Sequence, residues 1–185
     1  MANFGRNFGF RRMPWAYHRR GRFYVPTPNT LLFGTPVVAT TTVDAARSGA
    51  QLLAQAGAAQ VPVPGQTGLI VWEMHPSGMS GRDPNLTDYS DIDRAKDGEL
   101  VQLVHGVGVK VVLRNTAATT FGTRTYAARK MIDLTGLAVG DYLRPLASPS
   151  DTNGYWTKQS GSEPKWLVVT SIDSTRNEVE AELQF

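Results

Sequence analysis

The sequence predicts an all-β fold, and three observations lead to this prediction. The 185 residues include 18 glycines and 11 prolines, which favours turns over long helices. From residue 67 onward, short apolar segments with period-two alternation recur at spacings of roughly 8–15 residues. Segments with a helical period are scarce. We therefore expect a small β-barrel or β-sandwich, preceded by an extended N-terminal arm and a short Ala-rich connector.

The composition excludes several classes of protein. The chain has no cysteine, so disulfides, thiol nucleophiles and cysteine-bound metal centres are excluded. No apolar run approaches the ~20 residues that span a bilayer, and the opening residues lack the apolar segment of a secretory signal. The three histidines, His18, His75 and His105, lack helical ligand spacing. We expect a soluble protein, intracellular when made, with no cofactor, no metal and no membrane partner.

Residues 1–43 form the predicted arm, and their charge sets them apart. They contain six arginines and no acid, whereas residues 44–185 carry 13 basic and 16 acidic residues, a net charge of −3. Seven of the 17 aromatic residues lie between residues 2 and 28, without periodicity. We predict that residues 2–28 lack regular structure and bury Phe10, Trp15, Tyr17 and Phe23 against other chains. The candidate partner-binding residues are the arginines and aromatic residues of this arm: Phe4, Arg6, Phe8, Phe10, Arg11, Arg12, Trp15, Tyr17, Arg19, Arg20, Arg22, Phe23 and Tyr24.

The arm has a second interpretation as a nucleic-acid tail. Arginines neutralise phosphates, and aromatic rings stack on bases. The aromatic density favours docking on protein, because a purely electrostatic tail needs no such anchors. Nucleic-acid binding is therefore the less expected alternative.

The connector, residues 44–66, follows one or two short extended pieces in residues 30–39, with a break at residues 34–36. Thr42 or Asp44 could cap a helix from about residue 45 to residue 58, rich in Ala, Leu and Gln. Gly49 and Gly57 weaken this helix. The alternative is an Ala-rich loop packed on a neighbour. Residues 61–65, VPVPG, are typical of a polyproline-like linker.

Residues 67–185 form the predicted β domain. Strands are expected at residues 68–75, at 98–104 and 107–115 as a hairpin through His105–Gly106, and at 120–129. After a turn-rich corner at residues 133–141, four short strands follow at 141–146, 151–159, 165–173 and 178–185, with turns at Asn153–Gly154 and Ser174–Asn177. Glu178, Glu180 and Glu182 should face away from the core. The expected core residues are Val101, Leu103, Val109, Val111, Leu113, Trp166, Val168, Val179, Leu183 and Phe185.

Possible chemical sites are few. Six acidic residues fall within residues 83–99, and such oxygens could bind calcium. Their order is not that of an EF-hand, and Arg94 and Lys96 lie among them, so a solvated or salt-bridged loop is the favoured interpretation. Ser77 and Ser80 lie near His75, but no third member of a catalytic triad can be assigned. No enzymatic activity is expected.

Residues 135–185 contain the run AVGDYL, an NGYW turn leading into a strand, KWLVVTSID and a closing EVEAELQF. This part of the chain resembles the capsid decoration (cement) proteins of tailed bacteriophages. The resemblance implies a small β-barrel that binds the outer surface of a capsid, across neighbouring subunits of the major capsid protein, as a homo-oligomer, most simply a trimer. It implies synthesis in the host cytoplasm and a place in the virion. A tail-tube subunit or another virion β protein is the alternative.

Overall fold

The computed structural model describes residues 8–12, 18–24, 31–45, 49–72, 94–95, 100–121 and 124–185. All regular elements in these residues are strands, so the predicted all-β class is confirmed. Their bounds are β1 (Phe8–Arg12), β2 (His18–Tyr24), β3 (Leu31–Leu32), β4 (Pro36–Asp44), β5 (Ala50–Gln55), β6 (Thr67–Trp72), β7 (Arg94–Ala95), β8 (Leu100–Val104), β9 (Lys110–Arg114), β10 (Thr119–Phe121), β11 (Arg124–Tyr126), β12 (Tyr142–Ser150), β13 (Gly154–Lys158), β14 (Leu167–Asp173) and β15 (Glu178–Leu183).

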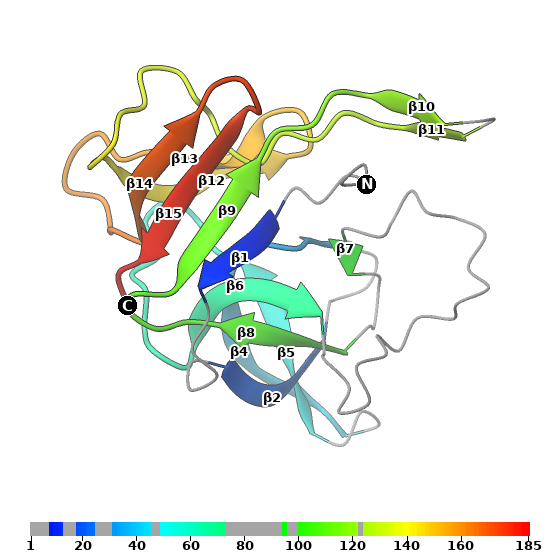
Figure 1. The fold of residues 1–185 in the computed structure, drawn as a ribbon. Coiled ribbons are helices and arrows are strands. Elements are labelled where there is room, and N and C mark those ends of the chain that lie inside the picture. Colours follow the sequence, from blue (N-terminus) through cyan, green and yellow to red (C-terminus); the bar gives the residue numbers. More distant parts are fainter. Residues whose placement is uncertain are drawn as a thin grey trace.

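The strands form two main sheets that pack against each other. One is a six-stranded sheet in the order β1-β9-β15-β14-β12-β13, and the other is a closed barrel in the order β2-β5-β4-β6-β8. Figure 1 shows the six-stranded sheet above the barrel, with the short β10–β11 hairpin extending to one side. Closure leaves the barrel without free strand edges, which removes the sites where sheets commonly aggregate.

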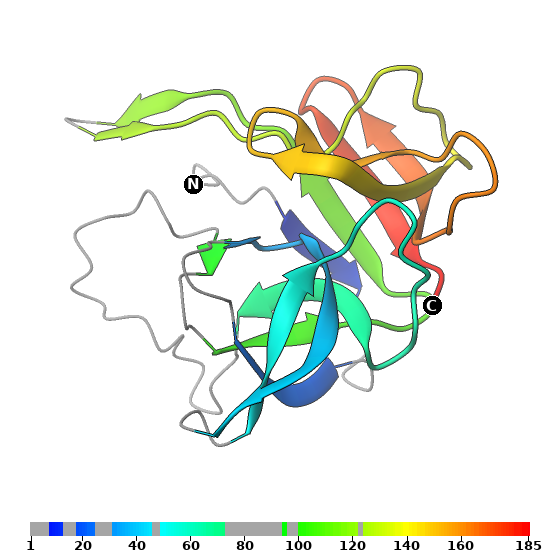
Figure 2. The same ribbon diagram turned by 180° about the vertical axis from the view of Figure 1, so that it is seen from behind.

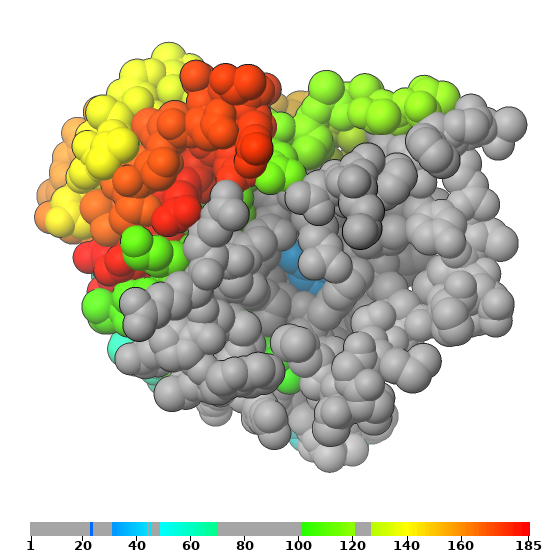
Figure 3. Space-filling model, viewed as in Figure 1, coloured from blue at the N-terminus to red at the C-terminus, as the bar shows by residue number. Residues whose placement is uncertain are grey.

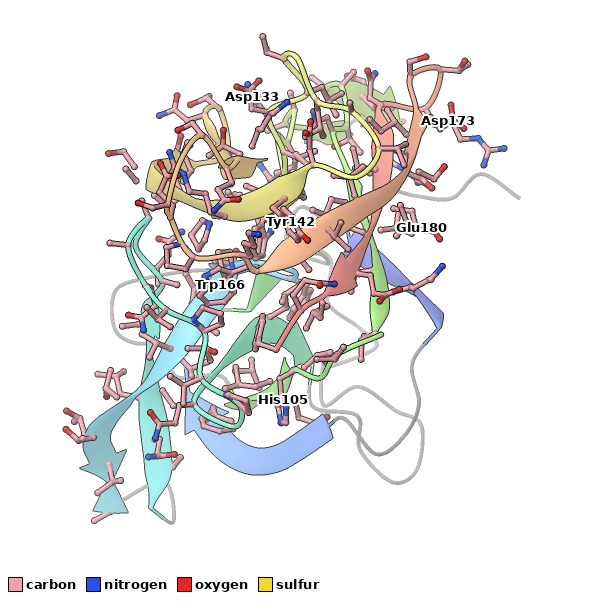
Figure 4. All side chains as sticks on the ribbon, turned by 90° about the vertical axis from the view of Figure 1, so that its left-hand side faces the viewer. His105, Asp133, Tyr142, Trp166, Asp173 and Glu180 are labelled. Atoms are coloured by element: carbon pink, nitrogen blue, oxygen red, sulfur yellow. The ribbon has the colours of Figure 1, made fainter. Side chains whose placement is uncertain are left out.

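A single apolar core joins the two sheets, and two tryptophans fix the contact between them. The indole Nε1 of Trp156 donates to the Gly34 carbonyl at 2.9 Å, and that of Trp166 donates to the Gln60 carbonyl at 2.8 Å. Gly34 lies in the turn just before β4, and Gln60 lies in the segment between β5 and β6, so both acceptors adjoin strands of the barrel. Figure 4 labels Trp166. Its ring packs edge-on against the rings of Trp156 and Phe185. The sheets are therefore joined by directional bonds as well as by apolar contact.

The chain crosses from the barrel to the six-stranded sheet at residues 105–109. Gly106 and Gly108 have φ of 118° and 87°, conformations that glycine adopts without strain. Their N–H groups donate to the carbonyls of Phe185 at 2.7 Å and Leu183 at 3.1 Å. The predicted hairpin of residues 98–104 and 107–115 is therefore wrong: β8 pairs with β2 and β6, and β9 pairs with β1 and β15. Both segments are strands, but the glycines turn the second one into the other sheet.

The predicted arm without regular structure is also wrong, because two parts of it are strands of the main sheets. β1 pairs with β9, and β2 pairs with β5 and β8. Phe23 has no exposed surface and lies in the core of its own chain, so its expected burial against other chains is wrong. The aromatic residue supplies core volume that the barrel needs.

The expected helix from about residue 45 to residue 58 is wrong as well. Residues 50–55 form β5, which pairs with β4 on one side and β2 on the other. The buried residues Ala50, Leu53 and Ala56 do not alternate, so the usual strand signal is missing from the sequence. Pairing on both edges overrides the local helix preference of Ala, Leu and Gln.

The C-terminal part follows its prediction closely. The four expected short strands are β12 to β15, and β14 pairs with both β12 and β15. Nine of the ten expected core residues are buried; Val168 is the exception, because β14 turns Leu167 and Val169 inward. The glutamates of β15 lie on the face opposite Val179 and Leu183, although Glu178 is itself only 4% exposed.

Candidate assembly surface

The described residues contain no group of three or more His, Cys, Asp or Glu side chains that could hold a metal ion. Within those same residues, no helix has the length and apolar character needed to cross a membrane. The six acidic residues between 83 and 99 lie outside the described residues, as do His75, Ser77 and Ser80. The questions of a bound cation and of a serine-based site therefore stay as predictions.

Nine of the thirteen candidate partner-binding residues lie in described strands, which belong to two different sheets. Phe8, Phe10, Arg11 and Arg12 belong to β1, in the six-stranded sheet. Those from residue 19 to residue 24 belong to β2, in the barrel. The remaining four, Phe4, Arg6, Trp15 and Tyr17, lie outside the described residues. The partner-binding role assigned to this set remains a prediction.

The β10–β11 hairpin is the feature whose form suits binding to another molecule. It is a separate two-stranded sheet with the register Thr119↔Tyr126, Thr120↔Thr125 and Phe121↔Arg124. The opposite views of Figures 1 and 2 both show it extending beyond the body of the protein. In the space-filling view its stem forms part of the upper margin of the surface (Figure 3). Six side chains of the stem are exposed: Ala117, Ala118, Thr119, Thr120, Ala127 and Ala128.

The chain enters the hairpin through residues 115–121, the outgoing leg, and comes back through residues 124–132, the returning leg. Asn115, at the start of the outgoing leg, closes the base of the hairpin. Its Oδ1 accepts the N–H groups of Met131 at 2.8 Å and Ile132 at 3.1 Å, and its Nδ2 donates to the Ile132 carbonyl at 2.9 Å. Beyond it, Thr116 and Arg129 exchange two backbone hydrogen bonds of 2.8 and 2.9 Å. The two legs are thus joined before the hairpin leaves the body.

Arg129 attaches the returning leg to the turn between β12 and β13. Its Nη1 lies 3.0 Å from Oδ2 of Asp151, and the hydroxyl of Tyr155 donates to Oδ1 of the same carboxylate at 2.8 Å. The Arg129 side chain is only 12% exposed, so solvent screens this ion pair less than it screens a surface pair. The backbone N–H of Lys130 also donates to the Asp151 carbonyl at 2.8 Å.

Two further carboxylates, those of Glu178 and Asp133, make contacts near the base of the hairpin. Glu178 of β15 pairs with the guanidinium of Arg114, the last residue of β9 and its register partner. Asp133 lies just past the returning leg. Burial opposes ionisation of Asp133, but hydrogen bonds from the Thr135 hydroxyl and N–H, together with the Lys130 ammonium, outweigh it, so the pKa of Asp133 lies below its ordinary value.

The sequence signal for the hairpin was a single glycine. Residues 120–129 alternate as one strand would, and they were expected to form one. Instead, Thr119–Phe121 and Arg124–Tyr126 are two antiparallel strands on either side of Gly122 and Thr123. A glycine within an alternating run marks a place where a strand can be interrupted.

Comparisons with known proteins give no family for this chain: no protein-family model, no curated protein and no solved structure matches it.

Proposed function

We propose that this protein is a structural virion protein that decorates a phage capsid and stabilises it by binding across neighbouring capsid subunits. The observation that carries the proposal is the β10–β11 hairpin, an exposed element that extends from the body and is fixed at its base. The all-β fold and the resemblance of residues 135–185 to decoration proteins support it. The partner is the major capsid protein, and no enzymatic activity is proposed.

The structure changes the route by which such binding would occur. The strands β1 and β2 are built into the protein's own sheets, so they are less suited to wrap a neighbour as a free arm. The β10–β11 hairpin would make the contact with the neighbouring subunit instead. Five residue steps from Thr116 to Phe121 reach about 17 Å at strand spacing.

Stabilisation would follow from mass action. A protein that binds the assembled lattice, and not the separated subunits, shifts the equilibrium toward assembly. In a trimer on a local threefold axis, rotational symmetry would place one hairpin over each of three neighbours. The place of action is then the outer surface of the virion. A tail-tube subunit remains the alternative, but it needs long hairpins that form a continuous inner sheet, and β10 and β11 have three residues each.

The test is binding of the full chain to undecorated capsids from a phage that encodes it, measured by co-sedimentation. In the test variant, residues 118–127 are replaced by Asn-Gly, which keeps the Thr116–Arg129 backbone pair. The control variant changes Thr175 and Arg176 to Ala, since both are exposed in the β14–β15 turn. We expect the parent and the control to bind and the hairpin variant to lose binding.

Two outcomes would contradict the proposal. If the parent chain does not bind capsids, decoration is wrong. If it binds DNA or RNA instead, with an affinity that falls steeply as salt is raised, the nucleic-acid interpretation of the basic N-terminal residues replaces it.

A further inference from the structure

We infer that Asn115 and Asp151 are positioning residues that hold the β10–β11 hairpin in one direction relative to the six-stranded sheet, so that it is ordered before any partner binds. The consequence for binding rests on the proposed function. The fixed direction itself is a property of the free protein and can be tested without a partner.

Asn115 connects the outgoing leg to the most buried part of the returning leg. Its carboxamide makes three hydrogen bonds to Met131 and Ile132, and both of these residues have no exposed surface. The Met131 carbonyl in turn accepts the N–H groups of Tyr155 and Trp156 at 3.0 and 2.9 Å. The outgoing leg is therefore tied, through one side chain, to a segment that is itself bonded to β13.

Asp151 holds the returning leg, and it does so from the turn between β12 and β13. Its carboxylate binds the guanidinium of Arg129 and the hydroxyl of Tyr155, whose own side chain is 6% exposed. Arg129 is also the residue whose backbone pairs with Thr116. One set of contacts thus joins the legs to each other and the second joins them to the body. A hairpin held by backbone pairing alone could still swing about its neck.

Holding the hairpin in this way costs free energy, because polar groups of Asn115, Arg129 and Asp151 are partly taken out of water. A flexible connection would avoid this cost. The carboxamide of Asn115, the carboxylate of Asp151 and Nη1 of Arg129 make directional bonds, each of which fixes an angle as well as a distance. Ordering the hairpin in the free protein removes an entropy loss that would otherwise fall on the binding step. Binding by the hairpin should therefore depend on two residues at its base that are not part of the exposed stem.

The test uses the absence of cysteine from the chain. Cysteines introduced at Thr119, on the hairpin, and at Ser174, in the exposed β14–β15 turn, carry nitroxide labels. The distribution of distances between the two nitroxide labels is measured by pulsed electron paramagnetic resonance. We expect one narrow distribution in the parent, and a clearly broader one in Asn115→Ala and in Asp151→Ala. The matched control is Gln159→Ala, which removes a side-chain amide bond to the Glu163 carbonyl, a bond that involves neither strand of the hairpin.

The results separate positioning from general stability. Asn115→Asp keeps the two acceptor bonds but replaces the donor with a carboxylate oxygen that faces the Ile132 carbonyl, so its distribution should also be broader than that of the parent. Asp151→Ala serves if Asn115→Ala fails to fold. A broad distribution in the parent, or a narrow one in both Asn115→Ala and Asp151→Ala, would overturn the inference.

The binding measurement is made on the same variants with undecorated capsids. We expect about tenfold weaker binding for Asn115→Ala and little change for Gln159→Ala. Equal affinity of Asn115→Ala and the parent would show that direction does not matter for binding and would overturn that part of the inference. If the parent itself does not bind capsids, the proposed function fails, while the distance distributions still decide whether these residues position the hairpin.

Discussion

Trp156 shows how much of the stability of the fold can depend on one buried hydrogen bond. Its ring is fully buried, and its Nε1–H donates to the carbonyl of Gly34, which is also buried. Trp166 is equally buried, but its acceptor, the Gln60 carbonyl, belongs to a half-exposed residue. Removal of the Trp156 indole would therefore leave a buried carbonyl without its donor, whereas removal of the Trp166 indole would leave a carbonyl of a half-exposed residue.

We expect Trp156→Phe to destabilise the protein more than Trp166→Phe. Both changes leave a smaller ring in the core, but only the first leaves a carbonyl that water cannot reach, which costs about 1–3 kcal/mol more. Urea unfolding followed by circular dichroism measures both free energies of unfolding. Equal losses in the two variants would mean that water satisfies the Gly34 carbonyl.

Gly68 provides a second comparison at the scale of one residue. A Cβ at this position would lie 2.7 Å from the backbone oxygen of Val104, within the barrel, whereas a Cβ at Gly57 would meet nothing within 4 Å. We expect Gly68→Ala to cost about 1–3 kcal/mol through this overlap and Gly57→Ala to leave the stability nearly unchanged. Thermal melting of the two variants tests this, and a neutral Gly68→Ala would show that β6 can move away from β8.

At the scale of the strand, two of the three glutamates on one face of β15 differ in their surroundings. The side chain of Glu178 is 5% exposed and bound to Arg114, whereas Glu180 is 25% exposed and 3.9 Å from Lys110. We expect Glu178→Ala to cost about 2–4 kcal/mol, because it leaves a mostly buried guanidinium without its carboxylate. Glu180→Ala should cost about 0–1 kcal/mol. Chemical unfolding at neutral pH separates the two, and similar losses would argue against a special role for the Arg114 pair.

Strands whose neighbours are close in sequence could be predicted, because their signal is local. The alternation in residues 178–185 placed Val179 and Leu183 in the core correctly. In β14, three apolar residues follow one another, and alternation alone could not choose between Val168 and its neighbours. The choice is made by β15, which pairs Leu167 with Leu183 and Val169 with Ala181.

Elements with distant partners were not predictable from local pattern. β5 contains helix-forming residues, and its strand form depends on β4 and β2. The segments at residues 98–104 and 107–115 look like a hairpin, but each finds its neighbours elsewhere, because Gly106 and Gly108 turn the chain between sheets. The candidate binding element was missed for a related reason: Asn115, which closes the base of the hairpin, bonds to residues 16 and 17 positions away.

At the scale of the whole molecule, three carboxyls in the described part of the chain should make stability depend on pH. Hydrogen bonds from Thr135 and the charge of Lys130 outweigh the effect of burial and lower the pKa of Asp133. The Lys158 ammonium and the Ala138 N–H lower the pKa of Asp141. The backbone N–H of Glu163 itself, followed by Ser160, lowers the pKa of Glu163. Each group releases its proton more readily in the folded state than its ordinary value of 3.8 or 4.5 would require.

The direction of the pH effect follows from these shifts. The stabilisation is fully present above the ordinary pKa values and is lost as pH falls through the lower values of the folded state. We expect the melting temperature to fall between about pH 5 and pH 3, and to fall less steeply in Asp133→Asn combined with Asp141→Asn. A melting temperature that rises on acidification in this range would contradict the assignment.

The position of β9 between β1 and β15 has a consequence for synthesis of the chain on the ribosome. One neighbour of this strand, β1, is synthesised before β9, and the other, β15, is synthesised about 70 residues after it. The barrel can close once β8 has emerged, but the six-stranded sheet cannot be completed until β15 leaves the exit tunnel. A product cut short before β15 would present β9 with an unpaired edge, so premature termination should give insoluble protein rather than a shortened, competent one.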